Sequence, residues 1–252
     1  MSARNFLIHG LIAGLFAGFA AFLVAHTVGE PPVDAAIAVE ESHARADVGH
    51  HHEEDGTVVS RENQSTWGLL TGTLAIGTAL GGLVALAAAG AVGRIGRLRP
   101  SQSTALVAVI GFVAVALVPF LKYPASPPAV GNPDTIGERT GLFFTFLAIS
   151  LAAGIASTVL ASRLLPGLGT YRTVLAALTA YLVVVVVAAE LMPTVNELGS
   201  FPAQTLWTFR RASLTTLVTL WGAIGFVLVG LVGRAHQRAA VETARRELAA
   251  SL

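Results

Sequence analysis

The chain has 252 residues, of which 54% are hydrophobic and only 12% are charged, and its mean hydropathy is +0.68. Soluble domains carry about 25% charged residues, so this composition excludes a water-soluble body and predicts a protein inserted among membrane lipids. A net charge of +1 argues against nucleic-acid binding, the lack of cysteine excludes thiolate metal sites, and the lack of a P-loop motif argues against ATP hydrolysis. We predict no enzymatic activity.

Apolar runs predict an all-α fold: a polytopic membrane bundle of about six transmembrane helices, each able to cross a hydrocarbon core of roughly 30 Å. The predicted spans are 6–28, 67–92, 103–121, 140–162, 173–192 and 213–232. The first run resembles a secretory signal but is longer, which favours a retained helix. Small residues at close spacing predict glycine-mediated helix packing, at Gly10, Gly14, Gly18, Gly68, Gly72, Gly77, Gly81, Gly222 and Gly225.

The distribution of basic residues predicts the orientation in the cytoplasmic membrane. If the N-terminus is inside, ten of the 16 basic residues are cytoplasmic, and the loops around 93–102 and 163–172 are short and purely basic. The positive-inside rule therefore places both termini in the cytoplasm. The predicted parts are a first transmembrane helix (1–28), an extracytoplasmic acidic His-rich loop (29–66), a membrane bundle of five further helices (67–232) and a charged cytoplasmic tail (233–252).

The loop 29–66 contains a cluster of histidines and carboxylates, with His43, His50, His51 and His52 as its candidate metal ligands. Such a tract is typical of weak binding of divalent transition metals through neutral imidazole. The alternative is a solvated acidic loop whose histidines are incidental. A loop of this kind would concentrate an ion at the mouth of a pathway and would not select it.

Ionisable residues within the predicted spans are few, and such residues are functional candidates by default. They are His9, His26 and Glu190. His9 lies near the cytoplasmic end of the first helix, whereas His26 and Glu190 lie at similar depth on the outer side. Together with Glu30, these two offer the nitrogen and oxygen donors that Co²⁺ or Ni²⁺ accepts. The alternatives are an ion pair between Glu190 and Arg210 or Arg211, or proton coupling.

Two segments and one dipeptide resemble a known family. The segments are GFVAVALVPFLKYPASPPAVGNPDTIGERT (111–140) and PTVNELGSFPAQTLWTFRRASLTTLVTLW (193–221), and the dipeptide is His9-Gly10 at the start of the first helix. From residue 103 onward the chain is similar to the CbtA family of predicted cobalt transporter subunits, and the unusual proline spacing in 119–133 makes the likeness fairly specific.

The resemblance implies uptake of Co²⁺ for cobalamin synthesis, with no covalent cofactor and with a small single-helix partner, CbtB, that carries a histidine motif. It also implies a structured outer vestibule built by two loops. The residues it marks are His9, Lys122, Tyr123, Pro124, Pro127, Pro128, Asp134, Arg139, Asn196, Glu197, Trp207 and Arg210. Ni²⁺ or Zn²⁺ remains an alternative ion. The scarcity of buried polar groups favours a second function class, an accessory or scaffold subunit of a larger membrane complex that transports nothing itself.

Overall fold

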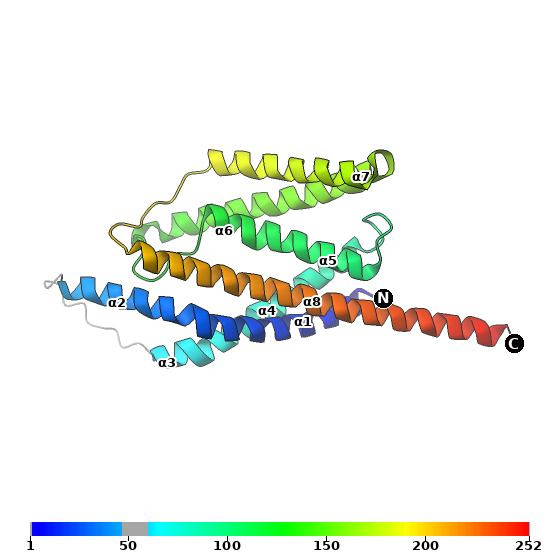
Figure 1. Ribbon diagram of the computed structural model, residues 1–252, viewed down its shortest axis with the longest axis horizontal. Coiled ribbons are helices and arrows are strands. Elements are labelled where there is room, and N and C mark those ends of the chain that lie inside the picture. The colour runs from blue at the N-terminus through cyan, green and yellow to red at the C-terminus, as the bar shows by residue number, and fades with distance from the viewer. Residues whose placement is uncertain (1, 47–59, 252) are drawn as a thin grey trace.

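The computed structural model describes residues 2–46 and 60–251, and every regular element in that part of the chain is a helix (Figure 1). The all-α prediction is confirmed. In chain order the elements are α1 (Ala3–Val24), the π-helical turn η1 (Ala25–Gly29), α2 (Glu30–Ala46), α3 (Arg61–Asn63), the π-helical turn η2 (Gln64–Gly68), α4 (Leu69–Ala91), α5 (Pro100–Gly111), the π-helical turn η3 (Phe112–Leu117), α6 (Val118–Lys122), the 3₁₀ turn η4 (Pro133–Thr135), α7 (Ile136–Leu191) and α8 (Ala203–Ala250).

The π-helical turns join neighbouring elements without a break, so the chain forms a few long helices. Five of those described are long and apolar enough to cross a membrane: Ala3–Ser42, Arg61–Ala91, Pro100–Lys122, Pro133–Leu191 and Ala203–Ala250. The first two continue into the region 29–66, which the sequence predicted as a loop. Good helix formers explain the extension, because 35–41 reads AAIAVEE.

The α7 element consists of two helices that fold back on each other. Gly169 interrupts it with φ 71° and ψ 169°, three residues after Pro166. Glycine adopts this left-handed conformation without the steric penalty of a side chain. Figure 1 shows the two parts lying side by side as a hairpin. A straight helix of 56 residues would extend about 84 Å, far more than the roughly 30 Å of a hydrocarbon core.

The closest contact between helices joins the backbones of α1 and α4. Gly14 lies against Gly77, and a Cβ built on Gly14 would lie 2.8 Å from the Gly77 carbonyl carbon and from Thr78 Cα. One turn to either side, Gly10 meets Gly81 and Gly18 meets Thr73 in the same way. A side chain cannot be accommodated here, because rigid backbone lies opposite.

Other glycines of the predicted packing set behave differently. Gly72 and Gly222 have no atom within 4 Å of an added Cβ, and Gly225 makes an ordinary contact of 3.4 Å with Ala108. The spacing in the sequence therefore does not identify by itself which glycines lie at an interface.

Buried apolar residues form two clusters. The larger one joins α1, α4, α5 and α8 and includes Ala17, Ala85, Trp221 and Leu228. The smaller one joins the two halves of α7 to η3, α6 and the following linker, around Phe146. The α7 hairpin therefore packs on η3 and α6, and it is separate from the glycine contact between α1 and α4.

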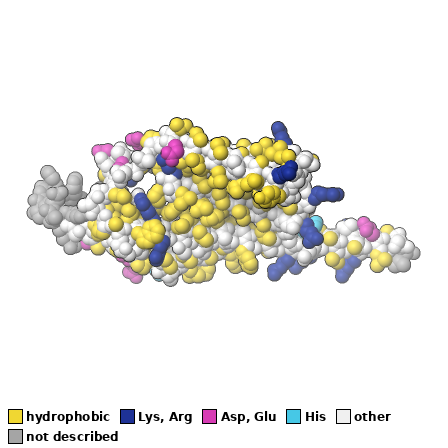
Figure 2. Space-filling model, turned by 45° about the horizontal axis from the view of Figure 1, so that its top comes forward, with side chains coloured by type: hydrophobic (Ala, Val, Ile, Leu, Met, Phe, Trp, Pro, Cys, Tyr) yellow, Lys and Arg dark blue, Asp and Glu magenta, His cyan; other side chains and the backbone are white. Residues whose placement is uncertain are grey.

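The two ends of the bundle differ in charge. Figure 1 places the N-terminus, the link 92–99, the Gly169 bend and the projecting end of α8 at one end, with the linkers 123–132 and 192–202 at the other. On the face in Figure 2, most basic side chains lie near the first end and most acidic ones near the second. Both termini thus share the basic end.

We predict that Gly14→Leu destabilises the fold whereas Gly72→Leu does not. The first change forces a side chain into backbone, and overpacking of this kind costs about 1–3 kcal/mol or more, whereas the second adds it in open space. Thermal unfolding of the purified variants in one detergent provides the measurement. Equal melting temperatures would show that the α1–α4 contact does not determine stability.

Candidate functional site

The linkers 123–132 and 192–202 meet at the acidic end of the bundle. Lys122, just before the first linker, makes the first contact between them. Its Nζ donates hydrogen bonds to the carbonyl oxygens of Ala189 at 2.6 Å and Met192 at 3.1 Å. The last carbonyls of a helix have no partner within the helix, and they attract cations. Lys122 therefore ties the end of α6 to the end of α7.

The linker 123–132 is fixed on both sides. The Tyr123 hydroxyl donates a hydrogen bond to the Pro193 carbonyl at 2.7 Å, and its ring meets Phe146 edge-on with centroids 6.0 Å apart. Arg210, in the second turn of α8, reaches the Ala125 carbonyl oxygen at an Nε–O distance of 3.5 Å. These contacts connect the start of α8 and the end of α7 to the same short segment.

Glu197, in the linker 192–202, binds the end of the other linker and the start of α7. Its Oε2 accepts hydrogen bonds from the Asn132 backbone N–H and the Thr135 hydroxyl, both at 2.9 Å, and forms an ion pair with Arg139 at 3.5 Å. The hydrogen bonds from Asn132 and Thr135, with the positive charge of Arg139, lower the pKa of Glu197 against a smaller opposing effect of burial. The carboxylate is therefore stabilised in its charged form.

Gly131 allows Arg139 to reach this position. Its φ is +104°, and a Cβ at this residue would lie 2.6 Å from Arg139 Cζ. The guanidinium, resting on the bare backbone, also donates from Nη2 to the Asn132 carbonyl at 3.2 Å. A glycine is required here both for the backbone conformation and for the close approach.

The structure thus brings together five of the residues that the family resemblance marks: Lys122, Tyr123, Arg139, Glu197 and Arg210. Asp134 and Asn196 lie at the same end and are exposed, and their side chains form no hydrogen bond or ion pair with another described residue. We call the linkers 123–132 and 192–202, together with these five contacting residues, the two-loop site.

His26, Glu30 and Glu190 do not assemble into a common site. Within residues 2–46 and 60–251, no three His, Cys, Asp or Glu residues form a group that could hold a metal ion. Glu30 instead pairs with Arg61, which also donates to Asp34 at 3.0 Å. Sequence reasoning missed this bridge, although Glu30 and Asp34 share the i, i+4 spacing of one helix face.

His26 has a defined partner in the π-helical turn η2. Its Nδ1 lies 3.0 Å from the Ser65 carbonyl oxygen, and its ring stacks on Phe22 with centroids 5.6 Å apart. Because a carbonyl can only accept, Nδ1 carries a proton in this contact, and in the neutral imidazole Nε2 then has the lone pair. His26 is exposed, and this nitrogen is the one that could bind a metal.

Glu190 is exposed in the last turns of α7 and forms no hydrogen bond or ion pair with any other described residue. The alternative pairing with Arg210 or Arg211 is thus not formed among the described residues. The other candidate in a span, His9, is half-buried near the opposite end, and its Nδ1 is enclosed without a hydrogen-bond partner in the described chain.

The remaining candidates belong to the His-rich tract. His43 lies in the last turn of α2, and His50, His51 and His52 lie outside the described residues. Metal binding by this tract stays a prediction.

Comparison with known families decides what the chain is. A family model described as "Probable cobalt transporter subunit (CbtA)" matches residues 3–233. The chain belongs to the CbtA family. Searches of curated proteins and of solved structures gave no match. The CbtA match spans the α1–α4 contact and the two-loop site and ends where the charged end of α8 begins, and its description implies a transport protein with partner subunits.

We predict that Glu197 makes stability depend on acid pH. The pKa of Glu197 in the folded chain lies below its ordinary value of 4.5, so its stabilising contribution is complete well above that value and is lost as the pH falls through the folded pKa. Melting temperatures of wild type and Glu197→Gln should differ at pH 7 and converge on acidification below about 4.5. Glu138→Gln is the control, since this exposed carboxylate pairs with no described residue. A Glu197→Gln difference that is constant with pH would contradict the role of the charge.

Proposed function

We propose that this CbtA-family chain is the membrane subunit of a cobalt uptake system and moves, or helps to move, Co²⁺ across the cytoplasmic membrane. The family match over residues 3–233 is the observation that carries the proposal. The five helices able to cross a membrane support it. The family description names transport and no catalysed reaction, which agrees with the prediction that the chain is not an enzyme.

We further propose six membrane spans with both termini in the cytoplasm. The break at Gly169 divides α7 into two helices, each long enough to span, which supports the count of six. The shared basic end of the termini and of the links 92–99 and 163–172 supports the orientation. In lipid, the α1–α4 glycine contact then provides the close packing that hydrophobic attraction cannot supply.

Single cysteines test this topology without background, because the chain contains none. Ser200→Cys in the two-loop site should react with an impermeant maleimide in intact cells, and Ser251→Cys at the end of α8 should react only after lysis. Both serines are exposed in the structure, so accessibility of the side chain is matched. Labelling of Ser251→Cys alone in intact cells would invert the proposed orientation.

In this orientation the two-loop site faces outward, and we propose that Co²⁺ enters there. Exposed residues at this end include Glu190, Asp134, Asn196 and His26, whose Nδ1 faces the Ser65 carbonyl. Oxygen and imidazole nitrogen donors suit a borderline divalent ion. Glu197 already pairs with Arg139, whereas Glu190 and Asp134 have no partner among the described residues. Of these two, Glu190, at the end of the apolar helix α7, is the one to which we assign the charge that the ion needs. The His-rich tract around 43–52 would raise the local metal concentration.

Glu190→Gln is the test of the ion-binding role. The amide keeps the shape of the side chain but removes the negative charge, so Co²⁺ accumulation should fall by roughly tenfold or more if Glu190 binds the ion directly. Accumulation is measured per folded molecule in cells that lack other cobalt importers, with Glu138→Gln as the matched control. Equal accumulation by wild type and Glu190→Gln would remove this residue from the pathway.

The word subunit in the family description implies partner proteins, and we propose a small single-helix CbtB-like protein as the partner. The uptake measurement is therefore made with and without that protein. Vesicles that contain the purified chain alone distinguish transport by this chain from an accessory role. Uptake only in the presence of another membrane protein would favour the accessory function.

A further inference from the structure

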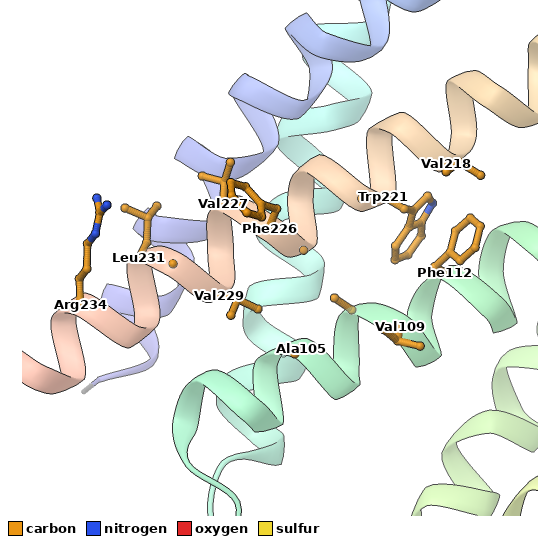
Figure 3. A pocket seen from close by; sticks show the side chains of 14 residues that line it. Ala105, Val109, Phe112, Val218, Trp221, Phe226, Val227, Val229, Leu231 and Arg234 are labelled. Atoms are coloured by element: carbon orange, nitrogen blue, oxygen red, sulfur yellow. The ribbon is translucent and has the colours of Figure 1, made fainter.

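An apolar groove runs along the bundle between α5 and α8. It has a volume of about 790 Å³, within the range of roughly 300–1,000 Å³ that ligand clefts occupy. Figure 3 shows its walls: Ala105, Val109 and Phe112 on one side, and Trp221, Val229 and Arg234 along α8. The groove lies outside the two-loop site and has no part in the proposed entry of Co²⁺.

The floor and one end of the groove have a defined form. Gly222 and Gly230 expose bare helix backbone, since an added Cβ would meet no atom within 4 Å at either position. Near one end of the groove Trp221 packs against Phe112, with ring centroids 6.4 Å apart, and against Gly111, and Val218 lines the groove one turn beyond. From that aromatic pair the open space extends toward the basic end of the bundle.

The length of the groove matches one leaflet of a bilayer. Thirteen residues of helix separate Trp221 from Arg234, which corresponds to about 20 Å along α8. Half of a hydrocarbon core measures about 15 Å, so a groove of this length reaches from the polar interface to the middle of the membrane. A partner's transmembrane helix would need a continuous surface across both leaflets, whereas this groove extends over little more than one.

Positive charge lies where the groove opens. Arg234 lines both the apolar groove and a second, polar hollow on the next turns of α8, whose walls include Arg238 and Arg245. A carboxylate, Glu242, also borders that hollow, and the three arginines exceed its charge. Basic pockets beside transmembrane helices bind anionic lipid headgroups.

We infer that this groove is a binding site for an anionic phospholipid of the leaflet at the basic end. One acyl chain lies on the glycine floor between α5 and α8 and ends at the Phe112–Trp221 pair. The headgroup phosphate accepts hydrogen bonds from the Arg234 guanidinium, whose planar set of donors suits phosphate oxygens. The inference requires membrane insertion but not cobalt transport, so either can fail without the other.

The test uses the full-length chain, purified in detergent and mixed with equal amounts of phosphatidylglycerol and phosphatidylcholine that carry the same acyl chains. Native mass spectrometry then counts the lipids that each variant retains. Wild type should retain phosphatidylglycerol in preference to phosphatidylcholine. Gly222→Leu fills the groove and should lose both, whereas Gly90→Leu adds the same side chain at another open helix position and should retain them.

A second pair of variants tests the headgroup. Arg234→Gln should keep acyl-chain binding but reduce the preference for phosphatidylglycerol about fivefold, the change expected for one basic residue at an anionic surface. Arg163→Gln removes an exposed basic residue near the same end but on α7, and should change nothing.

Three results would overturn the inference: equal lipid retention by Gly222→Leu and Gly90→Leu, an unchanged headgroup preference in Arg234→Gln, or the conversion of a wild-type dimer to a monomer by Gly222→Leu. The last result would assign the groove to a second copy of the chain. Thermal unfolding of each variant confirms that the comparison is made between folded proteins.

Discussion

The backbone contact between α1 and α4 is the constraint on which the larger half of the bundle depends. Lipid tails are as apolar as leucine, so burial of large apolar side chains gives little drive for helices to associate, and close packing must replace it. In the middle of α1 the chain accordingly buries small residues and exposes large ones: Ala13 and Ala17 are fully buried, whereas Phe16 between them is 62% exposed. This arrangement is the reverse of a soluble core and fits a lipid environment.

The α7 hairpin depends on a different kind of interaction. In its most apolar stretch only 11% of residues are buried, against 28–33% in the other four long helices. Apolar packing on η3 and α6 is therefore thin. Polar contacts at the two-loop site compensate: Lys122 holds the end of the hairpin, and Glu197, just beyond it, holds Arg139 near its start. The linkers thus add polar contacts to the limited apolar packing that positions the hairpin.

The sequence predicted the helical class, the presence of several helices able to cross a membrane, and the family, because these follow from hydropathy and from two long segments of unusual composition. It did not predict that the helices extend to Ala46 and begin at Arg61, since a polar helix lacks the hydropathy signal that marks a span. The i, i+4 pair Glu30 and Asp34 opposite Arg61 was available as a sign of this extension.

The candidate site residues were likewise predicted in part: those in the two linkers come together, and the proposed metal ligands do not. The residues that the resemblance marks in the two linkers largely come together, because they lie in segments whose prolines and glycines fix one backbone path, as Gly131 does for Arg139. The prediction of a metal set of His26, Glu30 and Glu190 rests on their similar depth and on their nitrogen and oxygen donors. Depth places residues in one layer of the membrane but not on facing helices, and Glu30 pairs with Arg61 in the same layer.

Glu190 then differs from Glu30 and Glu197 at this end, and it shares with Asp134, in the turn η4, the lack of a partner among the described residues. Glu30 has an arginine partner, and Glu197 has an arginine and two hydrogen-bond donors. Glu190 lies on an apolar helix within a few residues of the Lys122 contact, without a partner among the described residues. A carboxylate near hydrocarbon is costly unless water, a cation or a proton compensates its charge. Lys122 donates to backbone carbonyls instead, so the charge of Glu190 is compensated from outside the described chain. In the function proposed above, a Co²⁺ ion arriving at this end would be that compensation.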